Sequence, residues 1–286
     1  MANLKEIRNR ISSIGSTMQI TSAMKMVSAA KLKKAQDAIT AMRPYSSKLT
    51  ELLQNLSATL DSDAGGAYSK QREVSKVLLV VVTSNRGLCG GFNSSVIKET
   101  TQNIEANYQD VDVDLLTIGK KGNDILSKSY PVIDVRNDIF DNLTFDYVAE
   151  VAEKIMKLYS DGTYDKIEII YNRFKNAATQ IPQVEQFLPI KPVEGDTNAS
   201  ADYIFEPSKE KIVLELIPKS LKTQLYKAVR DSFAAEHGAR MTAMHKATDN
   251  ATELRDELLL TYNKARQAAI TNEILEIVGG AEALKN

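Results

Sequence analysis

The sequence predicts an α/β protein in which two long helices, one at each end of the chain, form an antiparallel coiled coil beside a central Rossmann-like domain. Two observations predict the helices: apolar and small residues recur at alternating steps of three and four from residue 4, and again from residue 244. The third observation is the alternation of short apolar runs with amphipathic stretches between them. The expected segments are a first helix over 1–60, an α/β domain over 74–206 and a second helix over 207–286.

The first long helix has a seam of alternating steps that runs from Leu4 to Met42. Its positions are Leu4, Ile7, Ile11, Ile14, Met18, Thr21, Lys25, Ser28, Leu32, Ala35, Ile39 and Met42. Pro44 predicts a kink rather than a stop, because leucines resume the pattern after it. A second apolar row at Ile20, Met24 and Val27 lies off the seam, so this helix has more apolar surface than one partner helix would cover.

The second long helix, from Pro207 to Leu284, contains no loop signal strong enough to end it. Its expected seam is Met244, Ala247, Ala251, Leu254, Leu258, Thr261, Ala265, Ala268, Asn272 and Leu275. Because so many of these side chains are small, the partner helix must come close and little area is buried per heptad. We therefore expect Ala251 and Ala265 to pack against the first helix.

Connectivity determines how the two helices pair. The first enters the central domain at its C-terminal end and the second leaves at its N-terminal end, so they run antiparallel. Lengths of roughly 56 and 66 residues correspond to about 84 and 100 Å, which leaves the second helix overhanging. The expected apolar tip comprises Ile270, Ile274, Leu275, Ile277, Val278 and Leu284. A tip without a partner in its own chain needs another protein around it.

The composition restricts the class of protein. With 286 residues, 43% hydrophobic and 26% charged, the chain is expected to be soluble and cytoplasmic, with no direct bilayer insertion and no signal peptide. One cysteine and two histidines predict no disulfide and no metal site. A net charge of −1 hides +7 in residues 1–48 and −9 in the middle of the chain, which indicates different partners at the two ends. No aromatic residues interleave with the basic ones, so no nucleic-acid partner is expected.

Four buried strands are predicted in the middle of the chain. They cover 77–83, 113–118, 132–135 and 167–171, with helices at 94–108, 120–129 and 144–160 between them. This alternation is typical of a parallel sheet with crossover helices. Residues 181–205 are interpreted as a hairpin or edge strand that closes the sheet.

The loop from Ser84 to Phe92 is rich in glycine and joins a strand to a helix, which is where many folds bind phosphate. However, neither a GxGxxG nor a GxxxxGK[ST] motif is present, and Gly119-Lys120-Lys121 lacks the rest of a P-loop. Cys89 has no nearby histidine to act as a base. We therefore expect a tight structural turn, with no catalytic residue and no cofactor.

Three motifs resemble one known family. The stretches 20–31 (ITSAMKMVSAAK), 84–93 (SNRGLCGGFN) and 270–283 (ITNEILEIVGGAEA) look like those of the γ subunit of bacterial F-type ATP synthase, in the same order and over essentially the whole chain. The resemblance implies a rotor shaft inside a hexamer of α and β subunits, with catalysis on β. It further implies that the α/β domain binds the ε subunit and the c-ring at the cytoplasmic face of the cell membrane.

Carried over to this sequence, the family's contacts to β are implied at Arg266, Gln267, Thr271 and Glu273, with Met24 and Lys25 opposite them. Each of these residues also has an ordinary interpretation as a packed or solvated helix position. The single cysteine implies that the redox switch of photosynthetic members is absent.

Two other classes of protein stay open. One is an α/β nucleotide-binding enzyme dimerised by its long helices, which ATP binding or hydrolysis by the isolated chain would reveal. The other is a coiled-coil scaffold, which does not explain a seam of small residues that ends in an apolar tip. Co-purification with a hexameric ATPase would separate the rotor from the scaffold.

Overall fold

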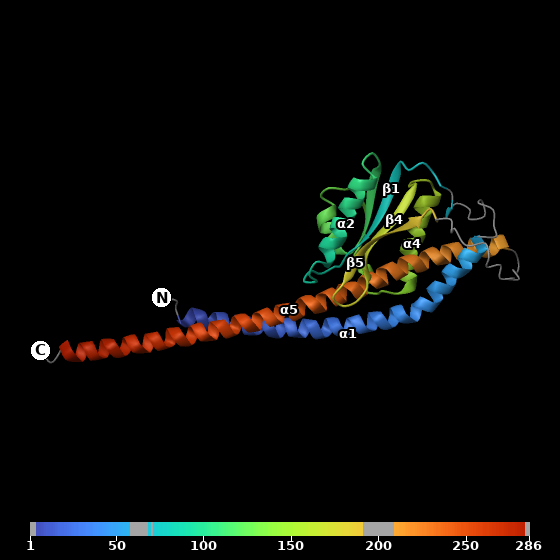
Figure 1. Cartoon of the computed structure of the whole chain (residues 1–286). Coiled ribbons are helices and arrows are strands. Elements are labelled where there is room, and N and C mark those ends of the chain that lie inside the picture. Colours follow the sequence, from blue (N-terminus) through green and yellow to red (C-terminus); the bar gives the residue numbers. More distant parts are fainter. Residues whose placement is uncertain (1–3, 58–67, 70, 191–208, 284–286) are drawn as a thin grey trace. The chain divides into compact units, whose positions relative to one another are not determined.

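The computed structural model describes residues 4–57, 68–69, 71–190 and 209–283. Its two long helices are α1, Leu4–Ser57, and α5, Lys209–Ala283. The chain divides into two compact units, residues 29–240 and a unit of 1–28 with 241–286, and each long helix contributes to both. As predicted, α1 continues through Pro44, and α5 likewise continues through Pro218 (Figure 1).

A five-stranded sheet forms the centre of the unit of residues 29–240. Its order is β3-β2-β1-β4-β5, and the first four strands are parallel while β5 runs antiparallel to β4. The strands are β1 Lys76–Val82, β2 Asp112–Ile118, β3 Val132–Arg136, β4 Lys166–Phe174 and β5 Gln180–Leu188. The predicted Rossmann-like domain is confirmed, with β5 as the edge strand. Residues 203–205, assigned to the same hairpin, lie outside the described residues.

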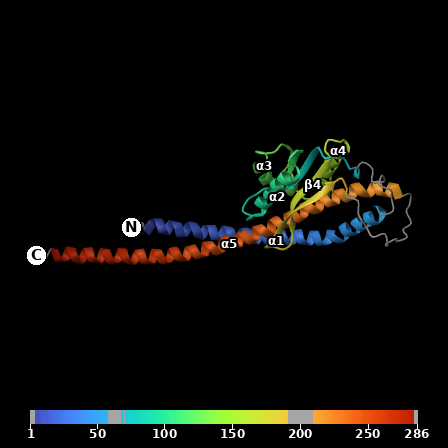
Figure 2. The same ribbon diagram turned by 45° about the horizontal axis from the view of Figure 1, so that its top comes forward.

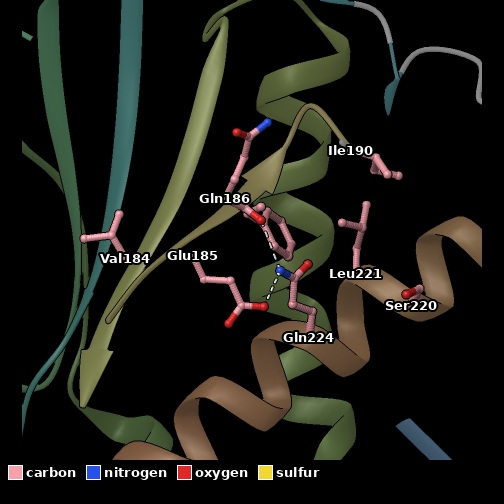
Figure 3. Close-up of a pocket in the computed structure, with 8 residues that line it drawn as sticks. Val184, Glu185, Gln186, Ile190, Ser220, Leu221 and Gln224 are labelled. Atoms are coloured by element: carbon pink, nitrogen blue, oxygen red, sulfur yellow. Dashed lines mark hydrogen bonds between the residues drawn. The ribbon is translucent and has the colours of Figure 1, made fainter. Parts of the chain in front are cut away.

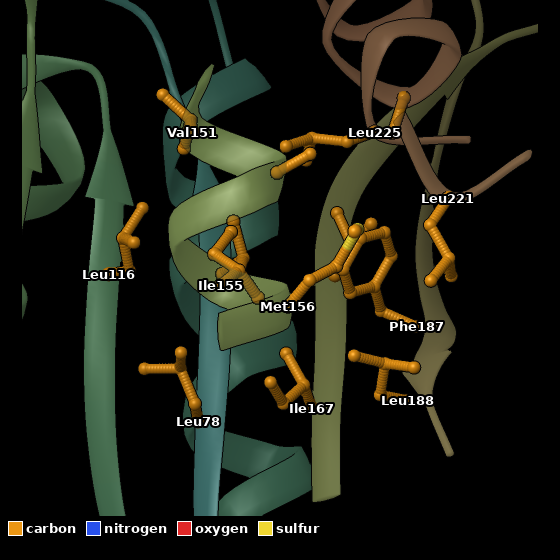
Figure 4. Close-up of a cluster of buried hydrophobic side chains, with 14 of the residues drawn as sticks. Leu78, Leu116, Val151, Ile155, Met156, Ile167, Phe187, Leu188, Leu221 and Leu225 are labelled. Atoms are coloured by element: carbon orange, nitrogen blue, oxygen red, sulfur yellow. The ribbon is translucent and has the colours of Figure 1, made fainter. Parts of the chain in front are cut away.

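Helices cover both faces of this sheet (Figures 1 and 2). The helices α2, Phe92–Asn107, and α3, Lys120–Leu126, pack on one face, while α4, Phe145–Ser160, and the first part of α5 pack on the other. Figure 4 shows Leu221 and Leu225 of α5 beside Met156 of α4 and Phe187 of β5. The first part of α5 is therefore a component of the domain's core.

The unit of residues 1–28 and 241–286 is an antiparallel pair of helices. Hydrogen bonds join Thr21 to Thr248 and Arg8 to Tyr262, so residues later in α1 face residues earlier in α5. All twelve predicted seam positions of α1 are buried or half-buried. The predicted seam of α1 is thereby confirmed.

The predicted seam of α5 is only half right. Leu254 is 45% exposed, and Thr261, Ala268, Asn272 and Leu275 are exposed as well. The positions buried or half-buried at three- and four-residue steps are Met244, Thr248, Ala251, Arg255, Leu258, Tyr262, Ala265 and Ala269. The observed seam takes its step of four residues where the predicted seam took its step of three. Thr248, Arg255 and Tyr262 therefore lie in the seam, and their hydroxyl or guanidinium groups bond to α1.

Candidate functional site

The β contacts implied on α5 are exposed. The side chains of Arg266, Gln267, Thr271 and Glu273 are all open to solvent, and the hydroxyl of Thr271 donates to the carbonyl of Gln267 at 3.0 Å. They follow Tyr262, whose hydroxyl accepts a 2.6 Å hydrogen bond from Arg8. These exposed side chains are thus accessible to another protein near the end of the paired part of the helices.

The expectation that Met24 and Lys25 lie opposite these residues is wrong. The bond between Thr21 and Thr248 places Lys25 beside the stretch around Met244, some 20 residues of helix, or roughly 30 Å, from Arg266. In this antiparallel register, residues later in α5 lie opposite residues earlier in α1. Because Tyr262 bonds to Arg8, Arg266 lies opposite the start of α1. The two groups of predicted contacts therefore form two separate levels along the paired helices.

The level of Met24 and Lys25 includes an apolar face of α1. Met24 and Lys25 are half-buried against α5, whereas Ile20, Met26 and Val27 are 59%, 64% and 57% exposed. An unpaired row of large apolar side chains on a helix is typical of a surface that another protein covers.

The tip of α5 is also uncovered by the residues that the structure describes. Every side chain from residue 270 to 282 is exposed, and the large apolar ones are Ile270, Ile274, Leu275, Ile277 and Val278, at 47% to 72%. Leu284 lies outside the described residues. The charged side chains in this stretch are all acidic, namely Glu273, Glu276 and Glu282.

The N-terminus of α3, which lies beside the carboxyl end of β1, is hydrogen-bonded within the domain. Strand β1 lies between β2 and β4, so the carboxyl end of β1 is the switch point of the sheet. There the backbone N–H of Lys120 donates to Asn85 at 3.1 Å, and that of Gly122 donates to the hydroxyl of Thr83 at 2.9 Å. The first N–H groups of α3 are therefore not available to a phosphate.

The loop between β1 and α2 is bound to α5 instead. The Arg240 guanidinium donates to the carbonyls of Arg86 and Gly87 at 3.1 and 3.3 Å, and pairs with Glu236 at 2.5 Å. Both charged residues are only 7% exposed. Burial raises the pKa of Glu236, while the charge of Arg240 opposes this rise.

An apolar cluster lies beneath these polar contacts. Cys89 and Phe92 from the loop pack with Ala235 and Ala239 of α5. The Asn93 amide donates to the Cys89 sulfur at 3.2 Å, and burial raises the pKa of the thiol. A buried thiol with a raised pKa is a poor nucleophile, so Cys89 is a packing residue.

The turn between β4 and β5 contacts α5 from another direction. A Cβ atom on Gly238 would lie 3.1 Å from the Cα of Ala177 and 3.3 Å from its carbonyl oxygen, so the absence of a side chain permits this close approach. Beside it, the His237 ring packs edge-on against Phe233 at 4.5 Å. Burial, assisted by the charges of Arg240 and Lys31, lowers the pKa of His237 to about 3.

Sequence reasoning assigned no role to Glu236, Gly238 or Arg240. A signal was present, because an oppositely charged pair at i and i+4 lies among small residues in Ala234-Ala235-Glu236-His237-Gly238-Ala239-Arg240. Charges within a stretch of small side chains predict a buried pair when another element packs closely on that face.

A cavity of about 330 Å³ lies between β5 and α5 (Figure 3). The Gln224 amide spans it and donates to the Glu185 carboxylate at 2.8 Å and to the Gln186 carbonyl at 3.1 Å. Tyr171 donates to the other Glu185 oxygen at 2.8 Å. Because both oxygens of this carboxylate already accept hydrogen bonds, it is a structural acceptor rather than a poised base.

The described residues contain neither a metal-binding cluster nor a membrane-spanning helix. Within the described ranges, no three His, Cys, Asp or Glu side chains gather in a way that could hold a metal ion. None of the helices in the described part of the chain has a stretch long and apolar enough to cross a membrane.

Comparison with known proteins gives consistent matches. The family described as "ATP synthase" matches residues 3–284. The ATP synthase gamma chain of Flavobacterium psychrophilum is 73% identical over 286 residues, the full length of both chains, and that of Flavobacterium johnsoniae is 73% identical over 285 residues, 99% of each.

Solved structures give the same picture of the fold. A chain of the Tetrahymena thermophila mitochondrial ATP synthase central stalk and c-ring is 28% identical with a TM-score of 0.61, covering 80% of this chain and 99% of that one. A chain of the Euglena gracilis mitochondrial ATP synthase, in a structure of OSCP, F1 and c-ring, is 22% identical with a TM-score of 0.71, covering 98% and 94%. At 22% identity the latter likeness concerns the fold alone.

Proposed function

The chain belongs to the ATP synthase gamma-chain family, and we propose that it is the central rotor shaft of an F-type ATP synthase, a subunit without catalytic residues of its own. Rotation of the shaft would couple proton-driven turning of a c-ring to conformational change in catalytic β subunits. The observation that supports this role best is the continuity of α5. It is one helix of 75 residues that begins in the core of the α/β domain and ends in an exposed apolar tip.

A shaft must meet different partners along its length. We propose that α and β subunits surround the paired helices and the tip, and that the α/β domain binds an ε subunit and the c-ring. The complex would lie at the cytoplasmic face of the cell membrane. The three working segments of this shaft would be residues 1–60, 74–206 and 207–286.

The contacts to β are proposed at the two levels described above. Arg266, Gln267, Thr271 and Glu273 offer directional hydrogen bonds that would favour particular rotor angles. Met24 and Lys25 would contact β about 30 Å away along the helices. The apolar tip has few fixed charges, which suits a bearing that turns with little angular preference. Each rotor angle must stabilise a different β conformation, because otherwise rotation could not bias the nucleotide sites.

The proposal is tested by assembly of the chain into a complex and by coupling of ATP hydrolysis to proton uptake. This chain should co-purify with a hexameric ATPase, and vesicles containing the complete complex should take up protons when ATP is added. Complexes prepared from cells without this chain serve as the control and should not couple hydrolysis to proton uptake. If the purified chain alone hydrolyses ATP, the nucleotide-binding enzyme is supported and the rotor is contradicted.

A further inference from the structure

We propose that the contacts between α5 and two loops of the α/β domain form a joint that keeps α5 from turning within that domain, so that torque passes between the helix and the domain. The α5 joint consists of Arg86, Gly87 and Cys89 from the β1–α2 loop, Ala177 from the β4–β5 turn, and residues 235–240 of α5. This inference rests on the proposed rotor function, because torque has no meaning in a static protein.

The first half of the joint is directional. Arg240 binds two successive backbone carbonyls, those of Arg86 and Gly87, while Glu236 holds the same guanidinium from one helical turn away. A planar guanidinium with several fixed donors tolerates little reorientation. The buried position of Glu236 and Arg240 keeps water from replacing these bonds. Rotation of α5 about its axis would break them.

The second half contacts the other side of the helix. Gly238 is two residues before Arg240, which places it roughly 200° away around the helix axis. At that position the backbone of Ala177 approaches so closely that a Cβ atom would lie 3.1 Å from its Cα. The helix is thus held between two loops from nearly opposite sides. A contact on one side alone would still let the helix turn about that contact.

The rest of the interface between α5 and the sheet is apolar. Ile217, Leu221, Leu225 and Val229 hold α5 against the sheet through apolar packing, which has no preferred direction of bonding. Arg240 is also where the unit of residues 29–240 ends along α5. The polar contacts of the joint therefore lie at the end of this unit along α5.

The first experiment measures coupling in vesicles that contain the complete complex, as the ratio of ATP-driven proton uptake to ATP hydrolysis. Arg240→Ala should lower this ratio at least threefold while hydrolysis continues. Arg240→Lys, which keeps the charge but loses the two-carbonyl geometry, should give an intermediate ratio and serves if Arg240→Ala does not assemble. Lys246→Ala removes an exposed cation of α5 and is the matched control, with an unchanged ratio.

The second experiment separates a mechanical role from loss of folding. Cys89 packs in one cluster with Ala239, so Ala239→Cys should form a disulfide with it when a copper–phenanthroline oxidant is added. In the Arg240→Ala or Arg240→Lys complex, the disulfide should restore the ratio to within twofold of the parent, and a reductant should abolish this rescue. Cys89→Ser in the same background removes the rescue.

The outcomes distinguish the joint from the rotor. If the parent complex does not couple hydrolysis to proton uptake, the proposed function fails. If the parent couples and the Arg240 variants couple equally well, only the joint is overturned. The joint is also overturned if the disulfide forms but abolishes turnover, because the loop must then release α5 during the cycle, or if the disulfide forms and the ratio of the Arg240 variants stays low.

Discussion

The hydroxyl oxygens of Thr21 and Thr248 lie 2.8 Å apart and share a hydrogen bond across the paired helices. Each hydroxyl is also within bonding distance of a carbonyl of its own helix, that of Met18 at 3.1 Å or Met244 at 2.8 Å. Thr21 is 9% exposed, so the bond is shielded from water. This bond fixes the antiparallel register, from which the two levels of proposed β contacts follow.

Thr248→Val should lower the free energy of unfolding by about 1 kcal/mol, because it keeps the shape of the side chain but leaves the Thr21 hydroxyl with one partner fewer. Thr261→Val is the matched control, since Thr261 is exposed and bonds only to the carbonyl of Glu257 among the described residues. Its effect should stay within about 0.5 kcal/mol. Equal effects of both substitutions on urea unfolding of the purified chain would argue against this register.

Ala265→Leu should destabilise the helix pair by about 1–3 kcal/mol, because the half-buried alanine leaves no room for a larger side chain against α1. Ala268→Leu introduces the same change at an exposed position of the same helix and should have little effect. Thermal unfolding of both variants tests the corrected seam. A loss for Ala268→Leu as large as that for Ala265→Leu would instead support the seam predicted from sequence, which contains both residues.

Acid should weaken the fold through His237. Its folded pKa of about 3 lies below the ordinary 6.5, so the unfolded chain binds the proton more readily, and stability falls as pH drops from about 6.5 toward 3. Between pH 7.5 and pH 5 the contribution of this one group is about 2 kcal/mol. The measurement is the free energy of unfolding of the purified chain at several pH values.

Two substitutions isolate this effect, because the chain has only two histidines. His237→Gln should flatten the pH dependence between pH 5 and 7.5. His245→Gln, at a side chain that is 57% exposed, should leave it in place. A pH dependence that is lost with His245 and kept without His237 would contradict the assignment.

The tip and the level of Arg266 should respond differently to mutation. Deleting the residues after Val278 should leave an assembled complex that still hydrolyses ATP, because the tip offers few directional bonds. Replacing Arg266 and Gln267 together with Ala should impair turnover and assembly more, since each charged hydrogen bond contributes about 1.5–3 kcal/mol at one rotor angle. If the short deletion abolishes turnover and the double substitution is neutral, the two roles are reversed.

Sequence patterns predicted the helices, the strands and the α1 seam because periodicity reports burial directly. The α5 seam was predicted half wrong because Ala247 and Thr248 are adjacent small residues, and composition alone does not decide which of them faces the partner. The level of Met24 was misplaced because register depends on particular pairs such as Thr21 and Thr248, which no single helix reveals. The charged pair of Glu236 and Arg240 was visible in the sequence, but its partners were not, because Arg240 binds backbone carbonyls, which have no sequence signature.

A rotor shaft must turn inside the hexameric ATPase that surrounds it. The most direct measurement attaches a bead to an exposed residue of α2 or α3 in a complex fixed to a surface through the hexamer, and follows the bead while ATP is hydrolysed. For a rotor shaft, the bead should rotate in one direction at a rate that rises with ATP concentration until turnover saturates. A bead that stays still while the same complexes hydrolyse ATP would contradict it.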